Sequence, residues 1–227
     1  MYYKNEKENV VSGLPLAINI FIRLREDILQ GKLKNGEKLT EQKICDLYNV
    51  SRTPVREAFR LLAQEGLLDM IPNRGAFVLG FDERDIADMY EMRKAYEILA
   101  FKWAIERITP EEFESIQEIY EQMEFYTLKK HYEKAAELNN RFHELIYEAS
   151  HNRLLTDILT SYQYYTKQFQ VGQKRDNSHM EEVLEEHYSM LKALQDRDVK
   201  LGVSMVRKHL DGSKQRAGYG DYPSYDD

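Results

Sequence analysis

The stretch Ser51-Arg52-Thr53-Pro54-Val55-Arg56-Glu57 decides how the first third of the chain folds. Serine is favoured at the position just before a helix, and the proline falls in the first helical turn, where its missing N–H costs nothing. Arg52 and Arg56 lie four residues apart, so they share one face of such a helix. Residues 51–64 are therefore predicted to form a helix that Ser51 caps and that presents two arginines side by side.

The residues on both sides of this helix complete a small domain. Apolar positions at helical spacing predict a helix over residues 14–30, and Thr40 is predicted to cap a second helix that runs to about Tyr48. After the arginine helix, residues 67–79 are predicted to form two short strands around a Pro-Asn-Arg-Gly turn. Three helices followed by a β-hairpin predict a winged helix-turn-helix over residues 1–80.

A winged helix-turn-helix places its third helix in the major groove of double-stranded DNA, where Arg52 and Arg56 can each donate two hydrogen bonds to a guanine edge. Ser51 and Thr53, together with the N–H groups of the first turn, suit a phosphate oxygen. Gly75 at the wing tip permits the positive φ that a turn close to the DNA backbone needs. The alternative is that both arginines only form solvated surface pairs with neighbouring acids.

The charge distribution fits this division of the chain. The net charge of the whole chain is −7, which by itself argues against a nucleic-acid partner. Residues 1–80, however, hold 12 Lys and Arg against 10 Asp and Glu, whereas residues 81–227 hold 20 against 29. Because phosphate repels the acidic part, we expect that part to face away from the duplex.

The pattern across residues 16–79 closely resembles the N-terminal domain of GntR-family bacterial transcription regulators. The segments SRTPVREA, LLAQEGLL and NRGAFV carry this resemblance, and their combination is highly specific. The resemblance implies that the domain binds DNA. It also implies base and phosphate contacts at Gln42, Ser51, Arg52, Thr53, Arg56 and the wing residue Gly75, with a backbone contact from Arg25 on the first helix.

The remainder of the chain has helical periodicity almost throughout. Residues 212–227 are rich in Gly, Tyr and Asp without periodicity, and we expect them to be a disordered tail. The expected fold class is mainly α, with the winged domain in residues 1–80 and an all-helical bundle in residues 81–211. The predicted helices of the bundle span residues 83–107, 110–128, 131–149, 152–171, 179–196 and 198–211.

Three histidines of the helical part stand out by their context. Asn139 and His143 lie four residues apart on one predicted helix, so their side chains project from the same face. His187 and His209 lie on two later helices. A bundle that brings these helices together would place three imidazoles and an amide oxygen around one point, a donor set that suits Zn²⁺ or Ni²⁺. The alternative is a metal-free cluster with a structural role.

Residues 83–211 are similar to the FCD ligand-binding domain of the FadR subgroup of GntR regulators. The segments YEMRKAYEILAFKWA, LNNRFHELIYEASHNRLL and EEHYSMLKALQDRDVKLGVSMVRKHL carry this similarity. It implies a divalent metal held by Asn139, His143, His187 and His209. Asn139 departs from the family, which usually has Asp there. An amide oxygen can ligate but brings no charge, so a carboxylate effector would neutralise more of the cation's charge.

Arg93 occupies a position where the family commonly has an arginine on the first helix of this domain. The resemblance implies that Arg93 can form a salt bridge with the carboxylate of an effector inside the bundle. The alternative is an ion pair with Glu97, which lies four residues further along the same predicted helix.

These observations predict a ligand-responsive transcription regulator, either a repressor or an activator, rather than an enzyme. We expect a homodimer, because two winged domains that contact a palindromic operator bind far more tightly than one. A small effector, expected to be a carboxylate, would bind at or near the metal. It would favour one arrangement of the DNA-binding domains and so change their affinity for the operator.

Two alternatives differ in what the histidines do. In the first, the protein is a regulator whose histidine cluster is metal-free and structural. In the second, a metal-dependent enzyme is fused to a DNA-binding domain, and the metal activates water. Glu144 and Glu186 are then the nearest candidate bases, although Glu144 should turn away from the helix face that carries His143.

The chain is expected to be a cytoplasmic protein with no membrane partner. No apolar run approaches the roughly 20 residues that a transmembrane helix needs, and the first residues lack the apolar stretch of a secretory signal. Cys45 is the single cysteine, which excludes an internal disulfide.

Overall fold

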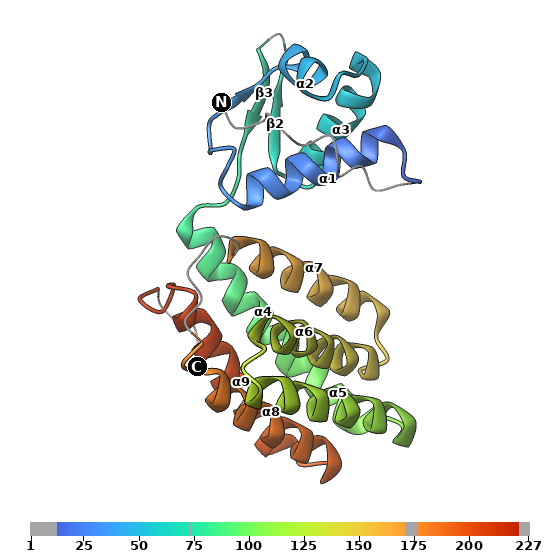
Figure 1. The fold of residues 1–227 in the computed structure, drawn as a ribbon, viewed down its shortest axis with the longest axis vertical. Helices are drawn as coiled ribbons and strands as arrows, with labels where there is room; N and C mark the ends of the chain where they lie inside the picture. The colour runs from blue at the N-terminus through green and yellow to red at the C-terminus, as the bar shows by residue number, and fades with distance from the viewer. Residues whose placement is uncertain (1–12, 73, 171–176, 223–227) are drawn as a thin grey trace. The chain divides into compact units, whose positions relative to one another are not determined.

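The structure is a computed structural model that describes residues 13–72, 74–170 and 177–222. The chain forms two compact units: the described residues up to Asp82, together with the segment that begins at Gln168, form the first, and the other described residues from Glu83 onward form the second. The first unit contains short helices and strands, and the second is all-helical (Figure 1). The mainly α fold class is thereby confirmed.

The first unit is the predicted winged helix-turn-helix. Its strands form one antiparallel sheet in the order β1-β3-β2, with Lys38 of β1 opposite Phe77 of β3 and Leu68 of β2 opposite Val78. The β2–β3 hairpin is the wing (Figure 1). The elements are α1 (Leu16–Leu29), β1 (Lys38–Leu39), α2 (Glu41–Tyr48), α3 (Arg52–Gln64), β2 (Leu68–Ile71) and β3 (Gly75–Val78).

The helix starts of the first unit follow the sequence with one exception. Thr40 caps α2 as predicted, because its hydroxyl oxygen accepts the N–H of Lys43 at 3.2 Å. Ser51 occupies the N-cap position of α3 in an extended conformation, but its side chain makes no capping hydrogen bond. Ser51 is therefore the predicted cap residue of α3, although its exposed hydroxyl does not bond to the N–H groups of the helix start.

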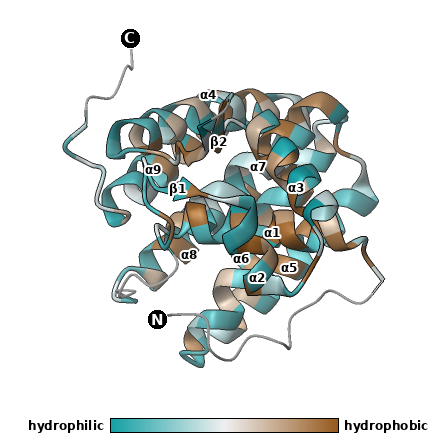
Figure 2. Ribbon diagram, turned by 90° about the horizontal axis from the view of Figure 1, so that it is seen from above, coloured by the Kyte–Doolittle hydropathy of each residue, from teal (hydrophilic) through white to brown (hydrophobic). Residues whose placement is uncertain are grey.

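Six helices make up the described part of the second unit (Figure 1). Gly202 on α9 lets this helix approach α4 closely, since a Cβ atom there would collide with the ring of Phe101. Hydrophobic and hydrophilic stretches alternate along the helices (Figure 2), and the hydrophobic faces meet in a core that includes Ile116, Phe142 and Met190. The helices are α4 (Glu83–Arg107), α5 (Pro110–Leu128), α6 (Tyr132–Ala149), α7 (Arg153–Phe169), α8 (Met180–Gln195) and α9 (Val199–Arg216).

The last helix extends beyond its predicted end. It reaches Arg216, five residues past 211, so the start of the predicted disordered tail is helical. Tertiary contacts explain the extension: the Lys214 side chain is buried, and its Nζ lies 2.7 Å from Glu91 Oε1 on α4. Beyond the helix, the ring centroid of Tyr219 lies 6.0 Å from that of Tyr90. Residues 223–227 of the predicted tail lie outside the described residues.

None of the helices in the described ranges combines the length and apolarity that crossing a membrane requires.

Candidate nucleic-acid interface and metal centre

The start of α3 presents the side chains that the sequence assigns to DNA. Ser51, Arg52 and Thr53 are exposed, and Arg56 is exposed one turn further along, with 63% of its side chain accessible to solvent. The opposite face of the helix, which includes Val55, is buried in the core of the unit. The helix therefore has the polar outer face and apolar inner face that a recognition helix needs.

The two arginines have exposed partners on α2. Arg52 donates to the Oε1 atom of Gln42 at 3.2 Å, and Arg56 Nε donates to Glu41 Oε1 at 2.8 Å. The nearby acid Glu57 pairs with Arg60 instead. Exposed ion pairs contribute about 0–1 kcal/mol, so DNA phosphates and bases can replace these partners at little cost.

A cleft of about 370 Å³ separates the starts of α2 and α3 from the wing. Its lining includes Arg74 and three of the residues predicted to contact DNA, namely Gln42, Arg52 and Gly75, whereas Ser51, Thr53 and Arg56 do not line it. Gly75 has a φ of +102°, and a Cβ atom there would lie 3.2 Å from the side chain of Lys38. The positive φ is the main reason for glycine at this turn, because the Lys38 side chain is flexible and needs to move only slightly to admit a Cβ atom.

Two other residues, Arg25 and Asn73, are also predicted to belong to this surface. Arg25 on α1 does not line the cleft; its Nε lies 3.1 Å from Glu65 Oε2, and its guanidinium lies 5.6 Å from the ring centroid of Phe21. Asn73, at the tip of the predicted wing, lies outside the described residues.

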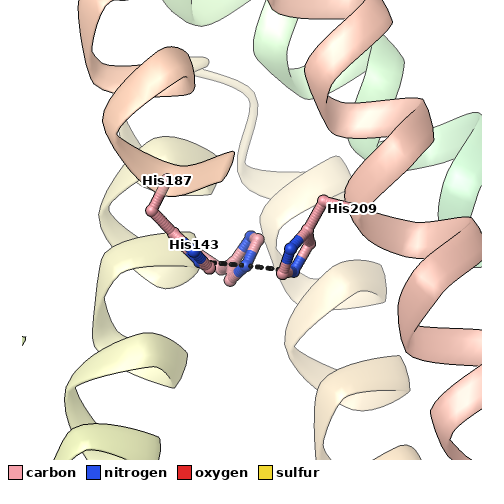
Figure 3. A group of neighbouring side chains, drawn as sticks. All are labelled: His143, His187 and His209. Carbon is pink, nitrogen blue, oxygen red and sulfur yellow. Dashed lines mark hydrogen bonds between the residues drawn. The ribbon is translucent and has the colours of Figure 1, made fainter. Parts of the chain in front are cut away.

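The second unit brings His143, His187 and His209 together from α6, α8 and α9 (Figure 3). The solvent-exposed fractions of His143, His187 and His209 are 2%, 0% and 5%. The Nε2 atom of His143 lies 3.2 Å from the Nε2 atom of His187 and 3.2 Å from that of His209. Within the described residues, these three form a group of His, Cys, Asp or Glu side chains that could hold a metal ion.

Each imidazole is oriented by an acceptor at its other nitrogen. The Nδ1 atom of His143 lies 3.1 Å from Glu97 Oε2, and that of His209 lies 3.0 Å from Glu186 Oε2. The Nδ1 atom of His187 lies 2.6 Å from the carbonyl oxygen of Val183. Because carboxylates and carbonyls only accept hydrogen bonds, each Nδ1 carries the hydrogen, and the three Nε2 lone pairs face one another.

The electrostatics of the cluster keep His187 and His209 neutral. Burial lowers the pKa of both His187 and His209 well below the ordinary value, and the neighbouring histidines lower each pKa further. Burial alone would raise the pKa of Glu97, but the charge of Arg93 and the contact with His143 outweigh it and hold that pKa well below its usual range. The site thus combines the neutral imidazoles of His187 and His209 with an ionised carboxylate behind His143.

This geometry fits a divalent metal. Two imidazole nitrogens at roughly 2.0–2.1 Å from a tetrahedral Zn²⁺ ion are about 3.3 Å apart. The observed Nε2 separations of 3.2 Å match this spacing. Facing lone pairs repel each other, so a cation between them removes an unfavourable contact and gives each buried nitrogen a partner.

The remaining predicted site residues differ in how closely they join the cluster. Asn139 is half-buried one turn before His143 on α6, and its amide nitrogen lies 3.5 Å from Asn140 Oδ1. Its role as a fourth ligand stays a prediction. Arg93 is buried, and its Nε donates to Glu97 Oε1 at 2.6 Å, which is the ion pair expected as the alternative to effector binding.

Sequence reasoning missed the connection between Glu97 and the histidines. Spacing identified Glu97 only as a partner for Arg93, and it identified Glu186 only as a candidate base. The structure shows that the two carboxylates contact His143 and His209. The adjacency of Glu186 to His187 offered no signal, because Glu186 contacts a histidine on a different helix.

Comparison with known proteins agrees with both units. The pattern described as "Bacterial regulatory proteins, gntR family" matches residues 16–78, and the FCD domain matches residues 88–212. The chain is 27% identical over 196 residues to the HTH-type transcriptional repressor RspR of Escherichia coli, covering 86% of each protein. It is 26% identical over 210 residues to the gluconate operon transcriptional repressor of Bacillus subtilis, covering 88% of this chain and 84% of the relative.

Solved structures support the same fold. The structure described as E. coli McbR/YncC superposes with a TM-score of 0.67 at 21% identity, covering 90% of this chain and 98% of that one. The relatives are transcription regulators rather than enzymes, which confirms the non-enzymatic prediction. The chain therefore belongs to the GntR family of bacterial regulatory proteins, as a DNA-binding transcription regulator with a C-terminal FCD domain.

Proposed function

We propose that this regulator is a cytoplasmic, metal-containing repressor whose affinity for its operator is set by a small carboxylate effector. The observation that carries the proposal is the convergence of three buried Nε2 atoms with their Nδ1 atoms already bound. That arrangement supports a divalent ion, Zn²⁺ or Ni²⁺, held by the histidines with Asn139 as the proposed fourth ligand. Repression is supported by the names of the relatives RspR and the gluconate operon repressor.

A metal held in this way would supply a Lewis-acidic centre, and it could take a carboxylate oxygen as a fifth ligand because Zn²⁺ sites can expand from four to five ligands. Arg93 is the proposed second contact for that carboxylate. A guanidinium has several N–H donors. Arg93 donates to Glu97 through Nε and to Thr166 through Nη1, and these two hydrogen bonds fix the orientation of the group. The effector would act through its greater affinity for one arrangement of the two units, which changes the affinity for DNA by linkage.

The DNA-binding part of the proposal is a homodimer on a palindromic operator. Two copies of the surface formed by Gln42, Ser51, Arg52, Thr53, Arg56 and Gly75 would each contact one half-site, and binding through both raises the affinity of each. Arg25 is proposed as an additional backbone contact.

The test begins with selection of binding sites from random duplex DNA by the purified full-length chain. The selected duplex is then titrated by fluorescence anisotropy with protein that is Zn²⁺-loaded, Ni²⁺-loaded or stripped with a chelator. Gluconate serves as the first carboxylate probe because it appears in the name of a relative. We expect a palindrome, and a change in affinity on adding a carboxylate that occurs only with metal present. An asymmetric site bound by a monomer, or an equal carboxylate effect without metal, contradicts the proposal.

A further inference from the structure

Two buried carboxylates lie directly behind the proposed metal ligands. Glu97 on α4 is 3% exposed and contacts His143 on α6, and Glu186 on α8 is 3% exposed and contacts His209 on α9. Each carboxylate therefore comes from a different helix than the imidazole that it orients. His187 instead uses the backbone carbonyl of its own helix.

We propose that Glu97 and Glu186 are positioning residues of the histidine site. Each carboxylate fixes the rotation of one imidazole with the hydrogen on Nδ1, and Glu186 also supplies negative charge that an amide at position 139 does not. This inference rests on the proposed metal site. It says that Glu97 and Glu186 raise the affinity of that site for the ion without contacting the ion.

The contacts of Glu97 show how firmly it is held. Its Oε1 atom accepts from Arg93 Nε at 2.6 Å and from the Tyr147 hydroxyl at 2.6 Å, which leaves Oε2 for His143. A carboxylate with both oxygens occupied in this way has little freedom to rotate, so the imidazole that it contacts is fixed as well.

Glu186 is buried, but the lysine that contacts it is exposed. Its other charged contact is Lys208, whose Nζ lies 3.6 Å from Glu186 Oε1 and whose side chain is 56% exposed. Such a pair is screened by solvent and compensates a buried charge poorly. A cation on the far side of the His209 ring would provide the compensation.

The charges of the cluster can be followed group by group. The charges of Arg93 and Glu97 cancel each other, and the neutral rings of His187 and His209 add none. Glu186 offsets half the charge of a divalent ion, and a carboxylate effector would offset the other half. The ion therefore binds without an aspartate at position 139 but still attracts an anionic ligand, as the proposed function requires.

Substitutions at Glu186 can separate orientation from charge. Glu186→Gln keeps an oxygen that accepts from the His209 Nδ1–H but removes the charge, whereas Glu186→Ala removes both. Glu182→Gln is the matched control, because Glu182 lies one turn earlier on α8, is exposed and also faces Lys208, at 3.8 Å. Glu97→Gln tests the other carboxylate. The glutamine keeps one oxygen that can accept from Arg93 or Tyr147, but it loses the negative charge.

The measurement is the Zn²⁺ dissociation constant of the full-length chain in competition with a chromophoric chelator, with the visible spectrum of the Co²⁺ form as a second readout. Loss of such partners weakens metal binding by about 10–100-fold. We expect Glu186→Gln and Glu97→Gln to weaken binding by about 10-fold and Glu186→Ala to weaken it further with a changed Co²⁺ spectrum. Glu182→Gln should match the wild type.

The outcomes separate this inference from the proposed function. If the wild type binds Zn²⁺ and the variants bind it equally well with unchanged spectra, the two carboxylates do not position the ligands and the inference is overturned. If the wild type does not bind Zn²⁺ at all, the proposed metal site and this inference fail together. A lower melting temperature of the metal-free Glu186 variants with unchanged Zn²⁺ affinity would assign Glu186 a purely structural role and also overturn it.

Discussion

The Nε2 atoms of His143 and His187 lie 3.2 Å apart although 44 residues separate them in the chain. Their Nδ1 atoms are bound to Glu97 and to the carbonyl of Val183, so neither ring can turn its other nitrogen toward the cluster without losing a buried hydrogen bond. The folded chain therefore holds these two imidazole nitrogens close together in the orientation that the proposed metal site needs.

Arg52→Ala should abolish specific operator binding while leaving the dimer intact. Arg52 is exposed at the start of α3, where it can reach a base edge, and loss of a bidentate contact with guanine costs about 1–3 kcal/mol at each half-site. Anisotropy with the selected and a scrambled duplex measures this, and sedimentation measures the dimer. Arg84→Ala, which removes an exposed arginine of α4, is the control. Retained discrimination between the two duplexes would refute the assignment of the recognition helix.

Gly75→Ala should destabilise the first unit and weaken DNA binding. The substitution forces alanine into a φ of +102° and places its Cβ 3.2 Å from Lys38, so we expect a loss of about 1–3 kcal/mol. Gly36→Ala has a positive φ but open space around its Cβ, and it isolates the steric part. Urea denaturation gives the free energies. Equal stability of wild type and Gly75→Ala would show that the wing does not need glycine.

Asn139→Asp should tighten metal binding. A carboxylate at this position adds a charged ligand one turn before His143, whereas the present amide adds none. Asn140→Asp places the same charge one residue further along and serves as the control. Zn²⁺ competition titration compares the three proteins. Weaker or unchanged binding by Asn139→Asp would mean that residue 139 is not a ligand.

The metal-free protein should lose stability as the pH falls through the mid-acidic range. The pKa values of His187 and His209 lie well below the ordinary histidine value of about 6.5 in the folded chain. Below a pH of about 6.5, the unfolded chain therefore binds protons at these histidines that the folded chain does not bind, and this difference favours unfolding. Melting temperatures of chelator-treated protein should fall between pH 7 and pH 5.5. A melting temperature that stays constant or rises over this interval contradicts the neutral buried cluster.

Lys214→Ala should destabilise the second unit by about 1–3 kcal/mol, because it removes a buried donor from Glu91. Lys200→Ala, at an exposed position on the same helix, provides the comparison. Thermal denaturation of the two variants distinguishes a folded extension of α9 from a passive tail. Indistinguishable melting temperatures would mean that residues beyond 211 add nothing to the domain.

Local signals predicted most of the fold, and contacts between distant residues account for the rest. The stretch at residues 51–57 and the cap at Thr40 set helix starts through neighbouring atoms, so the sequence was sufficient there. The end of α9 depends on Lys214 and Glu91, which lie 123 residues apart, and no local pattern encodes that pair. The Arg93–Glu97 pair could be expected from its spacing, but the contact of Glu97 with His143 required the assembled bundle.

The most direct test of the account is the metal content of the purified full-length chain, compared with that of His143→Ala. The exposed His131→Ala serves as the control, and circular dichroism establishes that all three proteins are folded. We predict about one equivalent of Zn²⁺ or Ni²⁺ per chain in the wild type and in His131→Ala, and almost none in His143→Ala. Equal metal content in the wild type and His143→Ala would contradict the histidine site.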